Sequence, residues 1–269
     1  TRPRLSPKAL SLGALISLPL GAWSAVPAAS QLLSVDVSND VTWTAGATTI
    51  DDEGARRVTL PATVTALDLG ALPANAQVNA YHALEDGRRI FALDLFADLG
   101  GGLSAGPGDL VAWNGTGFTL FFDGNAAGVP AGAKIDAVAR LRSGGVTSTI
   151  FSFDVAVALP GGLTVDDEDL VAWTGVAWSL HFDGSANGVP ELLDLDGFDQ
   201  DQVNGARYFS FDTSGRIASV DFDDEDVVAF DGAVWSLAYD ASVHLDPTFA
   251  AGDLSALGVR TVNIFSDGF

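Results

Sequence analysis

Cysteine is absent from the sequence. Its absence excludes disulfides, zinc–thiolate sites, iron–sulfur clusters and cysteine nucleophiles. Export remains possible without disulfides, because a domain of this size can be held together by apolar burial. Hydrophobic residues make up 48% of the chain and charged residues 18%, a composition that predicts a packed core rather than disorder.

Positive charge is also scarce, with 13 basic residues against 35 acidic ones and a formal net charge of −22. A nucleic-acid partner is excluded, because such binding needs cations along the phosphates. An anionic membrane surface is disfavoured for the same electrostatic reason. Cationic partners, metal ions or a high-salt environment fit this charge. The simplest explanation is that the acidic residues keep an extracellular β-protein soluble.

Familiar catalytic motifs are missing as well. The sequence has no HExxH, no GxSxG and no P-loop. Its three histidines, His82, His181 and His244, are far apart, and we interpret them as ordinary surface residues. A glycoside hydrolase that uses two carboxylates remains an alternative, because a chain with 35 acidic residues always offers pairs of them. The sequence therefore favours a non-enzymatic protein.

Long apolar runs are limited to one, Ala9–Leu20, which follows a basic segment containing Arg2, Arg4 and Lys8. Small residues come next, with possible cleavage after Ala25, Ala28 or Ala29. This layout predicts a signal peptide over residues 1–30 and an extracytoplasmic location: secreted, periplasmic or at the cell surface. The run is short for a membrane span and contains Pro19, so we expect no stable membrane insertion.

What the chain does have is an internal repeat of about 58 residues. Three series share this period: Asp36, Asp94, Asp154 and Asp212; Asp109, Asp169 and Asp226; and Phe118, Trp178 and Trp235. We place the copies at approximately 31–76, 77–133, 134–193 and 194–252, with a closing strand at 253–259 and a tail at 261–269. Residues 31–260 are expected to form a single repeat domain.

Each copy is expected to contain four short strands. In the third copy, Phe151–Val155 and Trp178–Phe182 alternate apolar and polar residues, as half-buried strands do. Leu170–Trp173 is continuously apolar, which suits a strand covered on both faces. Asn-Gly, Asp-Gly and similar pairs between these segments predict tight hairpins.

These features predict an all-β protein with four copies of a four-stranded meander, arranged as a four-bladed β-propeller. An open solenoid-like array and two sandwich-like domains are the alternatives; a closed ring protects edge strands without long connections. The first copy lacks a first strand, and residues 253–259 form a spare one in phase with the repeat. We therefore expect residues 253–259 to pair beside residues 32–37 and complete the first blade.

Three segments resemble those of a group of uncharacterised exported bacterial repeat proteins. They are Val165–Val171, Phe182–Ser185 and the closing Asn263–Phe269, which contains Ile-Phe-Ser-Asp-Gly-Phe. The resemblance extends over roughly residues 31–269 through the repeat. It implies export and a propeller-like fold, and it supplies no catalytic residues.

Acidic runs precede the third strand in two copies and are the candidate metal ligands: Asp166, Asp167, Glu168, Asp223, Asp224 and Glu225. Asp51–Glu53 is similar in the first copy. Calcium would need six to eight oxygen ligands, but neighbours in extended chain point in opposite directions. We favour solvated turns, with no cofactor, and keep calcium as the alternative.

Residues that occur in only one copy are better candidates for function than repeated ones, which are expected to build the scaffold. Trp43, Arg88 and Arg89 are the candidate ligand-binding residues on this ground. The leading hypothesis is an exported binding or scaffold protein with an unknown protein or glycan partner. A secreted hydrolase with unsymmetric carboxylates and a calcium-stabilised envelope protein are the alternatives.

Overall fold

The computed structural model describes residues 32–38, 43–45, 48–50, 55–59, 63–244 and 254–262, with side chains over 65–242 and 254–259. Residues 31–269 form one compact unit. The expected signal peptide, the acidic run at 51–53 and the tail at 263–269 lie outside the described residues.

Four antiparallel four-stranded sheets make up the structure, one for each expected copy. The second copy has the order β6 (Val78–Ala83), β7 (Arg89–Leu93), β10 (Leu110–Trp113) and β11 (Phe118–Phe122). The third has β12 (Ile135–Ser143), β13 (Val146–Phe153), β16 (Leu170–Trp173) and β17 (Trp178–Phe182). The fourth has β18 (Leu195–Gln200), β19 (Arg207–Phe211), β22 (Val227–Phe230) and β23 (Trp235–Tyr239). The expected all-β fold class is confirmed, and the meander order is present in each of these copies.

The first sheet joins the two ends of the repeat region, in the order β24 (Ala256–Val262), β1 (Leu32–Ser38), β4 (Ala55–Thr59) and β5 (Thr63–Leu67). β24 runs antiparallel to β1 from Leu32 opposite Val262 to Ser38 opposite Ala256. The expected pairing of the chain ends is thus present, although the paired segment lies three residues later than 253–259.

A short hairpin between the second and third strands of every sheet was not expected from the sequence. These hairpins are β2 (Trp43–Ala45) with β3 (Thr48–Ile50), β8 (Ala97–Asp98) with β9 (Ser104–Ala105), β14 (Val157–Leu159) with β15 (Leu163–Val165), and β20 (Gly215–Ile217) with β21 (Val220–Phe222). Each copy therefore has six strands, not four. Single helical turns follow the fourth strand in three copies: α1 (Gly124–Ala127), η1 (Ser185–Asn187) and α2 (Ala241–His244). Over the described ranges, no helix has the length and apolar character needed to cross a membrane.

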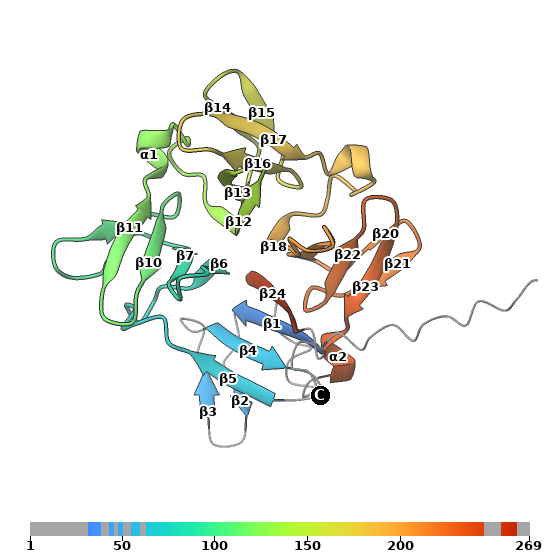
Figure 1. The fold of residues 1–269 in the computed structure, drawn as a ribbon, viewed down its shortest axis with the longest axis horizontal. Coiled ribbons are helices and arrows are strands. Elements are labelled where there is room, and N and C mark those ends of the chain that lie inside the picture. Colours follow the sequence, from blue (N-terminus) through green and yellow to red (C-terminus); the bar gives the residue numbers. More distant parts are fainter. Residues whose placement is uncertain are drawn as a thin grey trace, which may run out of the picture. The chain divides into compact units, whose positions relative to one another are not determined.

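The first strands of the four sheets lie side by side at the centre of the repeat unit (Figure 1). β6 contacts β12, β12 contacts β18, β18 contacts β24, and β24 contacts β6. The approach is close where β18 meets β24: a Cβ added at Gly197 would lie 2.5 Å from Cβ of Leu257. Glycine is therefore required at this position of β18.

The hydrophobic core is divided into clusters that lie between neighbouring sheets. One cluster joins Ile150 and Phe182 of the third copy to Phe198 and Phe209 of the fourth. Another joins Ile90 of the second copy to Phe151 and Trp178 of the third. Because each sheet buries its faces against its neighbours, a single copy cannot bury both faces by itself.

The fourth strand of the third copy departs from the expected alternation. Trp178 and Phe182 are buried, but Leu180 is 44% exposed and His181 is half-buried with its ring 6.1 Å from that of Phe198. The cause is a bulge, since Leu170 pairs with Phe182 and Val171 with Leu180, which leaves His181 without a partner in the ladder. His181 is therefore not the ordinary surface residue that the sequence predicted.

Candidate functional site

The repeated aspartates before the third strands hold the scaffold together. Asp169 accepts hydrogen bonds from the backbone N–H of Gly184 at 2.8 Å and of Asp166 at 3.1 Å. Asp109 and Asp226 make the same two bonds in their own copies. Each carboxylate thus ties the turn before the third strand to the turn after the fourth. This arrangement agrees with the expectation that repeated acids are architectural.

The two acidic runs that were candidate calcium ligands lie in turns of different sheets. Asp166 is exposed and Asp167 half-buried, whereas Glu168 and Glu225 are only 2% and 3% exposed. Burial is the main cause that raises the pKa of each glutamate to about 7. Within the described ranges, no three His, Asp or Glu side chains are gathered as a metal site would need. Asp223 and Asp224 belong to the second of these runs, so the six candidate ligands are divided between the turns before β16 and β22.

The three candidate ligand-binding residues have different surroundings. Arg89 donates from Nη1 to the backbone carbonyl of Asp68 at 2.7 Å, a link within the scaffold. Trp43 lies in β2, where the side chains are outside the described residues. Arg88 lines a pocket, so only this one of the three is placed in a candidate site.

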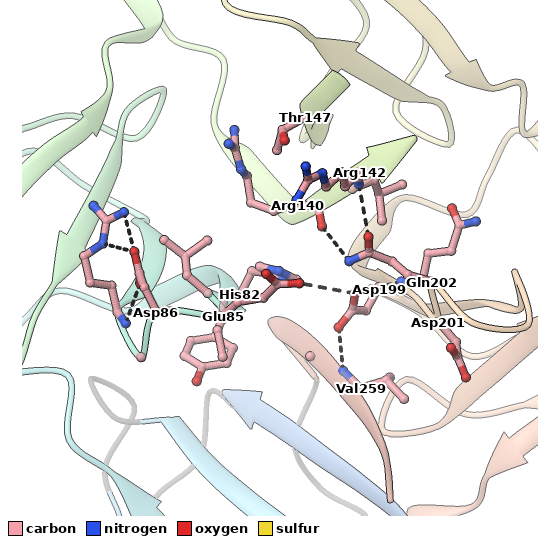
Figure 2. Close-up of a pocket in the computed structure, with 18 of the residues that line it drawn as sticks. His82, Glu85, Asp86, Arg140, Arg142, Thr147, Asp199, Asp201, Gln202 and Val259 are labelled. Carbon is pink, nitrogen blue, oxygen red and sulfur yellow. Dashed lines mark hydrogen bonds and ion pairs between the residues drawn. The ribbon is translucent and has the colours of Figure 1, made fainter. Parts of the chain in front are cut away.

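The pocket has a volume of about 980 Å³ and lies at the ends of the inner strands, where their hairpins begin (Figure 2). The second, third and fourth copies and β24 all contribute to it. Its polar lining residues are His82, Glu85, Asp86, Arg88, Arg140, Arg142, Thr147, Asp199, Gln200, Asp201 and Gln202. Ligand sites are commonly concave, mostly preformed and roughly 300–1,000 Å³ in volume.

The repeat symmetry is broken at this pocket. Val78, Ile135 and Leu195 begin the inner strands of the second, third and fourth copies, and Leu254 lies just before β24. The residue four positions after each of these is at an equivalent place in its copy: His82, Ala139, Asp199 and Gly258. Three of these four residues, His82, Asp199 and Gly258, line the pocket. Equivalent positions of one scaffold thus place a histidine, an aspartate and a glycine around a single cavity, and such a difference is what a site for one ligand requires.

A buried carboxylate organises one wall. Asp199 accepts hydrogen bonds from the backbone N–H of Gln200 at 2.7 Å and of Val259 at 2.8 Å. Its Oδ1 also lies 3.8 Å from Nδ1 of His82, and both side chains are largely buried. Asp199 therefore connects β18, β24 and β6 beneath the pocket.

Arginine and phenylalanine side chains form another part of the lining. Arg88 and Asp86 form an ion pair at 2.8 Å. The guanidinium carbons of Arg140 and Arg88 lie 5.3 Å and 6.0 Å from the centre of the Phe121 ring. Arg140 also donates from Nη1 to the Thr149 hydroxyl at 2.6 Å. The ring and the hydroxyl hold Arg140 in place beside the cavity.

Gln202 of the fourth copy is hydrogen-bonded to the third copy at the rim of the pocket. Its Oε1 accepts from the backbone N–H of Arg142 at 3.1 Å, and its Nε2 donates to the carbonyl of Arg140 at 3.4 Å (Figure 2). Two hydrogen bonds at the rim of the pocket therefore join residues that are about 60 positions apart in the sequence and belong to different copies.

Sequence reasoning missed Arg140, Arg142 and the pairing of His82 with Asp199. These residues come from three copies, and no local motif connects them. A usable signal was present, however: equivalent positions near the end of the inner strand carry a different residue in each copy.

In comparisons with known proteins, no protein-family description and no curated protein matches the chain.

Proposed function

We propose that this protein is an exported four-bladed β-propeller that binds a ligand in the pocket at the ends of β6, β12, β18 and β24. Four similar sheets, inner strands that contact each other in turn, and pairing of the chain ends support the propeller. The charge and apolar pattern of residues 1–30 support export.

The observation that carries the binding proposal is the loss of repeat symmetry at the pocket. Repeated residues such as Asp169 maintain the scaffold in several copies. His82, Asp199 and Arg140, by contrast, occur once each at their positions and meet around one cavity. A glycan or a peptide segment of a protein partner is the ligand class that we propose.

A screen of glycans and peptides by thermal unfolding tests this proposal. Glu85 is exposed at the rim, so Glu85→Trp should fill the entrance without disturbing the core. Glu191→Trp is the matched control, because Glu191 is exposed and lies outside the pocket. A true ligand should raise the melting temperature of the wild type and the control, and fail to raise that of Glu85→Trp. Ligands that protect all three proteins equally would place the binding site elsewhere.

A secreted hydrolase is the second candidate, because the pocket brings together the unrepeated acids Glu85, Asp199 and Asp201. If the protein only binds its ligand, we expect no hydrolysis of common glycans or esters. Asp199 is a poor candidate for a catalytic carboxylate, because it already accepts hydrogen bonds from two backbone amides. Reproducible turnover that disappears in Glu85→Gln but not in Glu191→Gln would establish the hydrolase instead.

A further inference from the structure

The third copy extends its inner hairpin over the pocket. β12 has 9 residues, whereas β6 and β18 have 6 each. Arg140 and Arg142 are two positions apart on this longer strand, so their side chains leave the same face of the sheet. Arg142 is paired with Thr147 across the hairpin, and all three residues line the pocket.

Most carboxylates of the pocket already have partners. Asp86 pairs with Arg88, and Asp199 accepts two backbone hydrogen bonds and lies beside His82. Asp201 accepts from the backbone N–H of Val203 at 2.7 Å, within its own turn. Glu85 is exposed at the rim.

The arginines of the extended hairpin are in the opposite situation. Within the described ranges, Arg140 and Arg142 have no carboxylate oxygen within 4.0 Å, although acidic residues outnumber basic ones 35 to 13 in the chain. Arg140 is half-buried, and among the described residues its side chain donates one hydrogen bond, to Thr149. The other guanidinium N–H groups of these two residues have no hydrogen-bond acceptor in the part of the chain that the structure describes, and a ligand could occupy them.

The cations also repel each other. Burial is the main cause that lowers the pKa of Arg140, and the positive charge of Arg88 lowers it further. Like charges held in a partly desolvated cavity raise the free energy of the empty protein. A bound anion would offset that repulsion, and a guanidinium can hold two oxygens of one carboxylate or phosphate at once.

We propose that Arg140 and Arg142, with the hydroxyl of Thr147, bind an oxyanionic group of the ligand: a carboxylate, a phosphate or a sulfate. The inference rests on the proposal that this pocket is the ligand site. A cavity of about 980 Å³ is much larger than such a group, so the anion is one end of a larger molecule. An acidic sugar residue or an acidic peptide side chain carries the required chemistry.

Sodium succinate, phosphate and sulfate are suitable probes, each compared with sodium chloride at equal ionic strength and pH. The chain has three histidines, and of the two whose side chains the structure describes, His82 lines the pocket and His181 does not, so histidine-selective labelling reports on the site by NMR. We expect at least one oxyanion to shift the His82 ring signals saturably and by more than sodium chloride does. The three salts distinguish a carboxylate site from a phosphate or sulfate site.

The variant Arg140→Gln/Arg142→Gln should raise the dissociation constant of that oxyanion by about tenfold or more, because charged hydrogen bonds are lost. Arg142→Gln alone is a second test in case the double variant is unstable, since Arg142 is exposed. Arg216→Gln is the matched control: it removes one charge at an exposed position in β20, outside the pocket. It should leave the dissociation constant unchanged.

Two results overturn the inference. Either no oxyanion shifts His82 beyond the effect of chloride, or the arginine variants bind the oxyanion as tightly as the wild type. A neutral glycan or peptide that shifts His82 equally in the wild type and in Arg140→Gln/Arg142→Gln would refute the anion site while the binding pocket stands. If no ligand of any class shifts His82, the proposed function fails together with it.

Discussion

Aspartate has distinct roles in this fold, and the surroundings of each carboxyl decide which one it has. Asp226 has a structural role, because its carboxylate accepts hydrogen bonds from the backbone N–H groups of Asp223 and Ala241, both at 3.0 Å. Asp136 is instead 5% exposed at a bulge in β12, and its Oδ2 atom has no hydrogen-bond partner among the described residues. Substitution should therefore have opposite effects at the two positions.

Asp226→Ala should lower the free energy of unfolding by about 2–4 kcal/mol, because two backbone donors lose a charged acceptor. Asp221→Ala is the control, since Asp221 makes an exposed ion pair with Arg216 and should contribute about 1 kcal/mol or less. Urea denaturation of both variants measures the difference. Equal losses would mean that the repeated aspartate is not a structural tie.

Asp136→Asn should stabilise the protein at alkaline pH. Burial is the main cause that raises the pKa of Asp136 to about 9, and the charge of Asp194 adds to it. An unfolded aspartate titrates near about 4. The folded carboxyl therefore holds a proton that the unfolded one has released, so stability falls as pH rises from about 4 to about 9. Asparagine is neutral throughout and removes this loss.

We expect Asp136→Asn to raise the free energy of unfolding by on the order of 2–4 kcal/mol at pH 8 and to change it little at pH 4.5. Melting curves at both pH values measure this, with Asp221→Asn as an exposed control. A variant whose stability relative to wild type is the same at the two pH values would show that Asp136 titrates normally.

Among the elements, the fourth strands of the third and fourth copies link their sheets to the preceding copy. Trp178 at the start of β17 donates from Nε1 to the carbonyl of Ala127 at 2.9 Å, and Trp235 at the start of β23 donates to Asn187 at 3.0 Å. In these two copies the repeated aromatic residue is thus both a core residue and a connection between copies. Packing, which the sequence predicted, is only part of its role.

Trp178→Phe keeps most of the packing and removes the donor, so we expect a loss of about 1 kcal/mol plus a small packing cost. Trp113→Phe is the matched comparison, because Nε1 of Trp113 is buried without a hydrogen-bond partner in the described structure. This second change should cost less. If Trp113→Phe is the more destabilising substitution in urea, the link to Ala127 is not an important contact.

The main strands were predictable from the sequence because each contains a regular apolar pattern between turn residues. Leu170–Trp173 is an example, and its predicted burial is confirmed for the first three residues. The inserted hairpins were not predictable, since strands such as Ala97–Asp98 and Ser104–Ala105 are two residues long and show no period. The bulge at His181 was also hidden, because alternation of residue types does not reveal an extra residue in the ladder.

At the scale of the whole molecule, the repeat predicted which strands would pair but only a small part of the candidate site. Arg88 was singled out because no other copy matches it, and it does line the pocket. His82 and Arg140 meet there only because β6 and β12 are neighbours at the centre. Such contacts depend on how the sheets are arranged, which no local pattern in the sequence specifies.

The pairing of β24 with β1 connects the two ends of the repeat region, and the structure around it explains why it should matter. β24 also contacts β6 and β18, and Ala256 and Leu257 in this strand are buried, as is Leu254 just before it. Its Val259 donates a backbone hydrogen bond to Asp199 beneath the pocket. Loss of this strand would expose the edge of β1 and break contacts with two further sheets.

Deleting residues 252–269 should therefore lower the free energy of unfolding by about 3 kcal/mol or more, from lost aliphatic burial and unpaired backbone groups. Deleting only residues 263–269 is the control, because β24 ends at Val262. A synthetic peptide covering residues 252–262 should restore part of the stability of the longer deletion, since it can pair again with β1. Urea denaturation and the His82 NMR signals would follow stability and pocket integrity together. If the longer deletion unfolds at the same urea concentration as the control, β24 does not close the arrangement of sheets, and the four-bladed propeller is wrong.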